Sequence, residues 1–147
     1  MDLIRDLFHN YVLISALTAW LAAQVLKTLF YLIRFKKINL ERLVGSGGMP
    51  SSHTAIVCSL STAVARTSGV SSPLFAVSII LAFIVMYDAA GVRRAAGEQA
   101  KILNRLIEHN YDFFEAQKAL KELLGHTPLE VFAGAVLGII VSFLMPV

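Results

Sequence analysis

Four long apolar stretches alternate with polar or glycine-rich segments along this chain. None of them contains Asp, Glu, Lys or Arg, and a helix needs about 20 mostly apolar residues to cross a membrane. The stretches are Leu7–Leu26, Thr54–Ala65, Thr67–Tyr87 and Val131–Val147. We therefore expect an all-α integral membrane helical bundle with four transmembrane helices, whose short second span is extended by residues 49–53 or shielded by its neighbours.

The polar residues between these stretches set the expected helix bounds. We predict helices over Asp6–Arg34, Ser51–Arg66 and Leu74–Tyr87. The third helix is expected to continue through Asp88–Lys101 and to leave the bilayer, because oppositely charged side chains three and four residues apart in this extension support a helix.

One interfacial amphipathic helix is predicted over Tyr111–Gly125. Asp112 and Glu115 have the spacing of a capping box, apolar residues recur at helical spacing, and Gly125 ends the pattern. We expect this helix to lie on the membrane surface and to carry no catalytic residue.

A second capping box begins the last span. Thr127 is the expected N-cap, Pro128 fits the first helical position, and Glu130 follows the cap by three residues. Further along this helix, Gly134 and Gly138 form a small-residue face that favours close helix packing.

Composition agrees with a membrane protein of one domain, residues 1–147. Hydrophobic residues make up 56% of the chain and charged residues 16%, which excludes an ordinary soluble globule. The lone Cys58 excludes an intrachain disulfide or a thiolate metal cluster. Asp2 and Asp6 precede the first apolar stretch where a signal peptide would be positively charged, so we expect a mature helix there.

A glycine-rich turn ending in Pro50, Ser51, Ser52 and His53 leads directly into the second span. Free backbone N–H groups and the positive end of the helix dipole make such a helix start suitable for binding a phosphate. The alternative is a capped loop, with Ser51 or Ser52 as N-cap and His53 as an ordinary polar residue of the first turn.

Lys27 and Arg34 lie seven residues apart near the end of the first helix, so they share a face about 10 Å apart along the axis. Both side chains can extend to the lipid headgroups, as is usual at helix ends. That interpretation is weaker for Lys27, which lies deeper in the apolar stretch and therefore calls for an anion.

Two further groups of polar residues have alternative interpretations. Asp88, Arg93 and Arg94 either belong to a site at the membrane interface or form a solvated, ion-paired extension. Glu130 follows His126 by one helical turn and can orient its imidazole, or serve only in the capping box. One carboxylate is expected to fulfil both roles only in part.

If the four spans alternate in direction, all of these residues emerge on the same face of the membrane. Two histidines, several cations and two helix N-termini directed at one place predict phosphoryl transfer, in which one imidazole attacks phosphorus and the other protonates the leaving oxygen. The residues concerned are Lys27, Arg34, Ser51, Ser52, His53, Asp88, Arg93, Arg94, His126 and Glu130.

Three motifs carry a resemblance to a known family. In order they are Lys27-x6-Arg34, Pro50-Ser51-Ser52-His53, and His126-x3-Glu130-Val131 followed by Ala133-Gly134. They resemble the motifs of the type 2 phosphatidic acid phosphatase and vanadium haloperoxidase superfamily, and more closely its short divergent membrane branch. The resemblance implies a helical bundle and a metal-independent phosphatase that forms a phosphohistidine.

The resemblance also implies residue roles. By motif position, His126 is the nucleophile, Glu130 orients it, and His53 is the general acid for the leaving group. The residues that bind phosphate are Lys27, Arg34, Ser51 and, through its backbone amide, Ser52.

The chain departs from the family pattern at four positions. Phe35 replaces a proline, Ser52 replaces a glycine, Glu130 replaces an aspartate, and Leu120 occupies the position of an arginine. We expect Arg94, or in second place Arg93, to supply the missing charge.

The sequence thus predicts hydrolysis of a lipid phosphomonoester or pyrophosphate whose headgroup reaches the site sideways from the bilayer. We expect membrane lipids and a lipid phosphate as ligands, no cofactor, no metal and no nucleic-acid partner. A homodimer is expected because four spans make a thin bundle around a charged cavity.

Two alternatives remain open. One is a non-catalytic membrane protein that binds a lipid phosphate, transports a lipid or scaffolds partners. The other is a metal site built from His53, His126, Glu130 and Asp88, against which the neighbouring Lys and Arg charges argue.

Positive charge outside the proposed site predicts the orientation of a multi-pass protein. The motif face carries seven such cations, against Arg5 and Arg66 on the other face, so the positive-inside rule places the active site on the cytoplasmic face and both termini outside. The seven are Lys36, Lys37, Arg42, Lys101, Arg105, Lys118 and Lys121.

Overall fold

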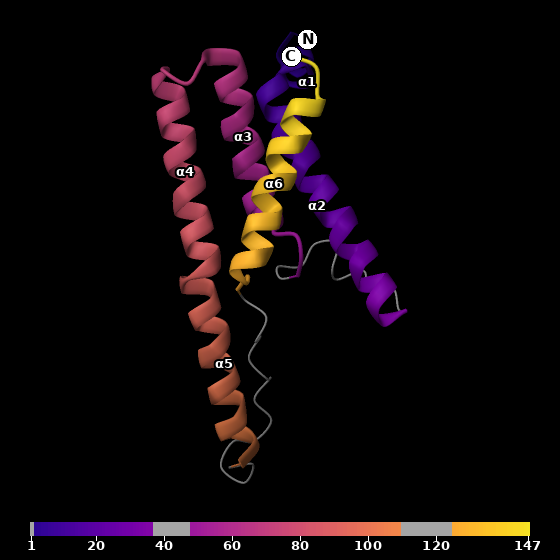
Figure 1. Ribbon diagram of the computed structural model, residues 1–147, viewed down its shortest axis with the longest axis vertical. Coiled ribbons are helices and arrows are strands. Elements are labelled where there is room, and N and C mark those ends of the chain that lie inside the picture. The colour runs from indigo at the N-terminus through magenta and orange to yellow at the C-terminus, as the bar shows by residue number, and fades with distance from the viewer. Residues whose placement is uncertain (1, 37–47, 110–124) are drawn as a thin grey trace.

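The computed structural model describes residues 2–36, 48–109 and 125–147, and every regular element in these ranges is a helix (Figure 1). The expected all-α class is therefore confirmed. The helices are α1 (Asp2–His9), α2 (Tyr11–Phe35), α3 (Ser52–Ser68), α4 (Pro73–Ala90), α5 (Val92–His109) and α6 (Pro128–Leu144). The predicted interfacial helix Tyr111–Gly125 lies outside the described residues except for Gly125.

The bundle is organised around α3, which contacts α2, α4 and α6. Figure 1 shows both chain termini at one end of the bundle, with α2 and α4 running away from that end and α3 and α6 running back towards it. The C-terminal halves of α2 and α4 therefore lie at the same end as the N-termini of α3 and α6. This is the arrangement that alternating helix directions predict.

Two predicted helix bounds are wrong. The expected helix Asp6–Arg34 is divided at Asn10, whose side-chain oxygen accepts a hydrogen bond from Leu13 N at 3.1 Å and so caps α2. The extension beyond Tyr87 is likewise divided, because α4 ends at Ala90 with Gly91 as its C-cap, and α5 begins at Val92. In both places a helix breaker or capping residue outweighs the helical pattern around it.

Small residues fill the interior and large apolar residues face outwards. Ala19, Ala23 and Ala55 form the core and are fully buried, whereas Ile84 is 61% exposed and Phe143 62% exposed. A soluble protein buries its large aliphatic and aromatic side chains. The opposite distribution is typical of helices that pack through small residues and present their large side chains to lipid.

Gly134 and Gly138 allow α6 to pack directly against the backbone of α3. A Cβ atom would lie 2.4 Å from the Ser51 carbonyl oxygen at Gly134 and 2.3 Å from the Ala55 carbonyl oxygen at Gly138. The predicted small-residue face is therefore confirmed, and it holds the N-terminal half of α6 against the start of α3.

Replacing Gly138 by alanine is expected to destabilise the bundle by about 1–3 kcal/mol, because the added methyl group overlaps backbone that cannot move aside alone. Thermal unfolding of the purified protein, followed by the fluorescence of Trp20, measures this effect. The adjacent Ile139 is 42% exposed, and its replacement by leucine is the matched control. Equal unfolding temperatures for Gly138→Ala and wild type would contradict the close packing described here.

The other end of the bundle is held by Arg66. Its guanidinium donates hydrogen bonds to the Tyr11 hydroxyl and to the carbonyl oxygens of Ser142 and Met145, the last at 3.1 Å. These carbonyls lie at the C-terminus of α6, where the helix dipole favours a cation. Arg66 therefore joins α2, α3 and α6 at the end away from the predicted site.

By length and composition, two helical stretches within the described ranges could cross a membrane. They are Tyr11–Phe35 and Pro73–Ile107, and the second runs through α4 into α5. Helix α6 is apolar but has only 17 residues. Four transmembrane spans thus stay a prediction.

Candidate active site

The two predicted catalytic histidines lie side by side at the end of the bundle away from the chain termini. The ring centroids of His53 and His126 are 6.4 Å apart, with 59° between the ring planes. His53 is the second residue of α3, and His126 lies two residues before α6. One tetrahedral phosphoryl group can therefore reach both imidazoles if it binds between them.

His126 is positioned by contacts at its backbone and its ring. His126 is 2% exposed. Its backbone N–H donates to the Ala89 carbonyl oxygen at the end of α4, at 3.0 Å. Its Nδ1 lies 3.3 Å from Glu130 Oε2. In the tautomer that carries its proton on Nδ1, the His126 ring donates to Glu130 and leaves the lone pair on Nε2.

Glu130 makes both of its predicted contacts with one oxygen. Its Oε2 accepts the Thr127 backbone N–H at 2.8 Å as well as the His126 hydrogen bond, while Glu130 N donates to Thr127 Oγ1 at 3.3 Å. The capping box and the orientation of the imidazole thus coexist. The expectation that one carboxylate serves both only in part was wrong, because both donors converge on the same atom.

Ser51, rather than Ser52, is the N-cap of α3. Its hydroxyl accepts from Thr54 N at 3.4 Å and from Thr54 Oγ1 at 3.1 Å. Its own N–H donates to the Glu130 carbonyl oxygen at 3.0 Å, which ties the starts of α3 and α6 together. Gly48 precedes this turn at φ 87°, a conformation that favours glycine.

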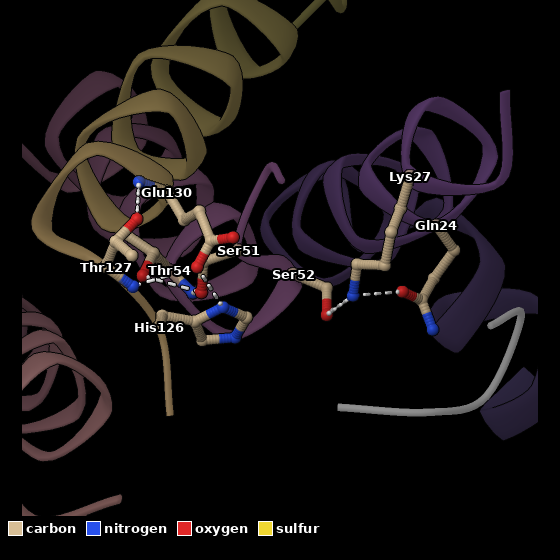
Figure 2. A network of polar contacts seen from close by, with 8 residues as sticks. All are labelled: Gln24, Lys27, Ser51, Ser52, Thr54, His126, Thr127 and Glu130. Carbon is tan, nitrogen blue, oxygen red and sulfur yellow. Dashed lines mark hydrogen bonds and ion pairs between the residues drawn. The ribbon is translucent and has the colours of Figure 1, made fainter. Parts of the chain in front are cut away.

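Lys27 turns into the protein. Its side chain is 3% exposed, and its Nζ donates to Gln24 Oε1 at 3.0 Å and to Ser52 Oγ at 3.3 Å. Figure 2 shows the Lys27–Gln24 pair on one side of Ser52, with His126 and Glu130 on the other. The interpretation of Lys27 as part of a site is the one that this geometry favours.

A cavity of about 650 Å³ is lined by Lys27 and Glu130, but by neither of the two histidines. Charged side chains from α2 and α6 line it, namely Lys27, Arg34 and Glu130, together with a mostly apolar wall. Arg34 is exposed, and its guanidinium carbon lies 5.8 Å from the centre of the Phe35 ring. The remaining lining residues are Phe30, Tyr31, Ile33, Phe35, Gly48 and Met49.

Three other predicted residues lie around the end of α4. Asp88 is half-buried in the last turn of α4, beside Ala89, whose carbonyl binds His126. Arg94 has an exposed side chain. Its backbone packs closely against Gly125, where an added Cβ atom would lie 2.2 Å from Arg94 Cα. Of Arg93 only the backbone, in the first turn of α5, is described.

Gln24 is a site residue that the sequence interpretation missed. It is 3% exposed and contacts the buried ammonium of Lys27 directly. An amide three residues before a lysine, within an apolar stretch, was the available signal, because residues at this spacing share a helix face.

The alternative metal site does not form. Its proposed ligands were His53, His126, Glu130 and Asp88, all of which the structure describes. Within residues 2–36, 48–109 and 125–147, no three His, Cys, Asp or Glu side chains come together in a group that could hold a metal ion.

Known proteins resemble this chain over nearly its whole length. Residues 8–141 match the family described as the Divergent PAP2 family. The "Uncharacterized membrane protein YuiD" of Bacillus subtilis (strain 168) is 45% identical over 152 residues, covering 95% of this chain and 96% of the relative. No solved structure matches significantly.

The family match confirms the resemblance found in the three motifs, since residues 8–141 contain all of them. The relative is described as a membrane protein, in agreement with the outward-facing apolar side chains of this bundle. The chain is a membrane protein and belongs to the Divergent PAP2 family.

Proposed function

We propose that this protein hydrolyses a phosphomonoester or pyrophosphate of a membrane lipid through a phosphohistidine intermediate. The observation that carries the proposal is the approach of the His53 and His126 rings to 6.4 Å, with Glu130 bound to Nδ1 of His126. Two imidazoles at this distance, one of them in contact with a carboxylate at Nδ1, support nucleophilic attack by His126 and acid catalysis by His53.

The reaction proceeds in two halves. His126 Nε2 attacks phosphorus, the N–P bond forms as the P–O bond to the lipid breaks, and His53 gives its proton to the leaving oxygen. Water then attacks phosphorus and gives a proton to His53, while the N–P bond breaks and releases inorganic phosphate. Glu130 stabilises the positive ring of His126 during both halves.

The phosphate oxygens are held by cations and by the start of α3. Lys27 and Arg34 line the cavity, and the first turn of α3 begins after Ser51, so the backbone amide of Ser52 and the positive end of the helix dipole favour an anion there. Arg94, whose backbone lies against Gly125, is proposed to bring its side chain to the phosphate, with Asp88 supporting the α4 end.

The lipid part of the substrate is inferred from the surroundings of the cavity. Its wall is mostly apolar, and the outer faces of the bundle present large apolar side chains. We propose four membrane spans, sideways access of the headgroup from the bilayer, a cytoplasmic active site with both termini outside, and a homodimer.

A non-catalytic role in binding or carrying a lipid phosphate is the second candidate. It is favoured by the exposed side chain of Arg94 and by Leu120 at the position where the family has an arginine. Such a protein would retain the phosphate-binding cations and lose the transition-state charge stabilisation.

Phosphate release by the purified protein in lipid nanodiscs distinguishes the two candidates. Phosphatidic acid, phosphatidylglycerophosphate and a polyprenyl pyrophosphate are offered, with and without EDTA. We expect release from at least one lipid at a rate that EDTA leaves unchanged. Binding without release would favour the second candidate, and release abolished by EDTA would overturn the metal-independent mechanism.

A further inference from the structure

We infer that Gln24 is a neutral positioning residue, which holds the ammonium of Lys27 at the phosphate site while leaving its positive charge to act on the bound phosphate. The inference rests on the proposed function, since that function makes Lys27 a phosphate ligand. It assigns a role to a residue that belongs to none of the three motifs.

The first step is geometric. Gln24 and Lys27 are one turn apart on the same face of α2, and each is 3% exposed. Lysine carries a flexible four-carbon side chain and loses much rotamer freedom when it is fixed. Lys27 Nζ donates to Gln24 Oε1 on α2 at 3.0 Å and to Ser52 Oγ on α3 at 3.3 Å. These two hydrogen bonds fix its position.

The second step concerns charge. The amide oxygen of Gln24 and the hydroxyl oxygen of Ser52 are neutral acceptors, so these two hydrogen bonds hold Lys27 without cancelling its charge. A buried charge interacts more strongly than an exposed one because the surroundings screen it less. A carboxylate at position 24 would hold Lys27 equally well but would neutralise it.

The third step compares position 24 with the acid already on the cavity wall. Glu130 lines the same cavity as Lys27, but its Oε2 is bound by His126 and Thr127 at the start of α6. A second carboxylate beside Lys27 would bring the formal charge of Lys27, Arg34, Glu130 and residue 24 from +1 to zero. An amide at this position therefore preserves the attraction for a phosphate.

The substitution Gln24→Glu separates positioning from simple packing. It keeps the size and shape of the side chain and strengthens the contact with Lys27, so a residue needed only for packing would tolerate it. We expect binding of inorganic phosphate and of vanadate to weaken at least about tenfold, because the new carboxylate lies in contact with Lys27, the cation that binds the anion. The KM for the lipid should rise more than kcat falls, and the unfolding temperature should not decrease.

Two further variants complete the experiment. Gln99→Glu makes the same chemical change at an exposed position of α5 and is expected to bind phosphate as wild type does. In a Lys27→Gln background, Gln24→Glu is expected to weaken phosphate binding less than it does in wild type, because it no longer neutralises Lys27.

The outcomes are distinguishable from those of the proposed function. Phosphate and vanadate binding by Gln24→Glu at wild-type strength would overturn the inference, as would a wild-type protein that binds neither anion. An equal further loss in the Lys27→Gln background would overturn it too. Weaker anion binding by Gln24→Glu without any lipid hydrolysis by wild type would support the inference while the proposed function fails.

Discussion

The variant His126→Ala is expected to lose lipid phosphate release by at least about 10³-fold, because no other group in the proposed mechanism forms the bond to phosphorus. Single-turnover experiments with radiolabelled lipid should show a phosphoryl-enzyme in wild type and none in the variant. The backbone hydrogen bond from residue 126 to Ala89 does not depend on the imidazole, so the bundle should remain folded.

His9→Ala is the matched control for this experiment. His9 is exposed on α1, near the N-terminus and at the opposite end of the bundle from the site. The His9→Ala variant should hydrolyse lipid at the wild-type rate. Phosphate release that survives in His126→Ala would refute nucleophilic catalysis by this histidine.

The variant His53→Ala is expected to slow hydrolysis of a lipid phosphomonoester by about 10²–10⁴-fold, the usual contribution of a general acid. The loss should be much smaller for p-nitrophenyl phosphate, because its leaving group departs without a proton. Comparing kcat/KM for the two substrates in wild type and variant measures this difference.

His53 could act as a general acid or bind phosphate. Only the first role makes the loss of kcat/KM in His53→Ala depend on the leaving group. Lys27→Gln is the informative comparison, since loss of a binding cation should slow both substrates to a similar extent. Equal losses for both substrates in His53→Ala would contradict its role as general acid.

Much of the local structure followed from local patterns. The capping box at Thr127 and Glu130 and the small faces of Gly134 and Gly138 depend on residues within a turn or two of one another, so spacing alone predicted them. The helix breaks at Asn10 and Gly91 were missed. There a single capping or flexible residue interrupts an otherwise helical pattern.

The interactions of individual side chains were less predictable. The sequence left Lys27 with two interpretations, and it did not show that Gln24 and Ser52 would hold its ammonium inside the bundle. Nor did it show that one oxygen of Glu130 would accept from both Thr127 and His126. Rotamers and hydrogen-bond partners depend on which helices become neighbours and at what distance.

By itself, the sequence determined the helical class and the membrane character and indicated the candidate site residues other than Gln24, because apolar periodicity, caps and short motifs are properties of neighbouring positions. Only the tertiary structure decided that His53 and His126 become neighbours and that Lys27 is buried beside Gln24. Those distances are set by the close packing of α3 against α2 and α6, to which residues far apart in the chain contribute together.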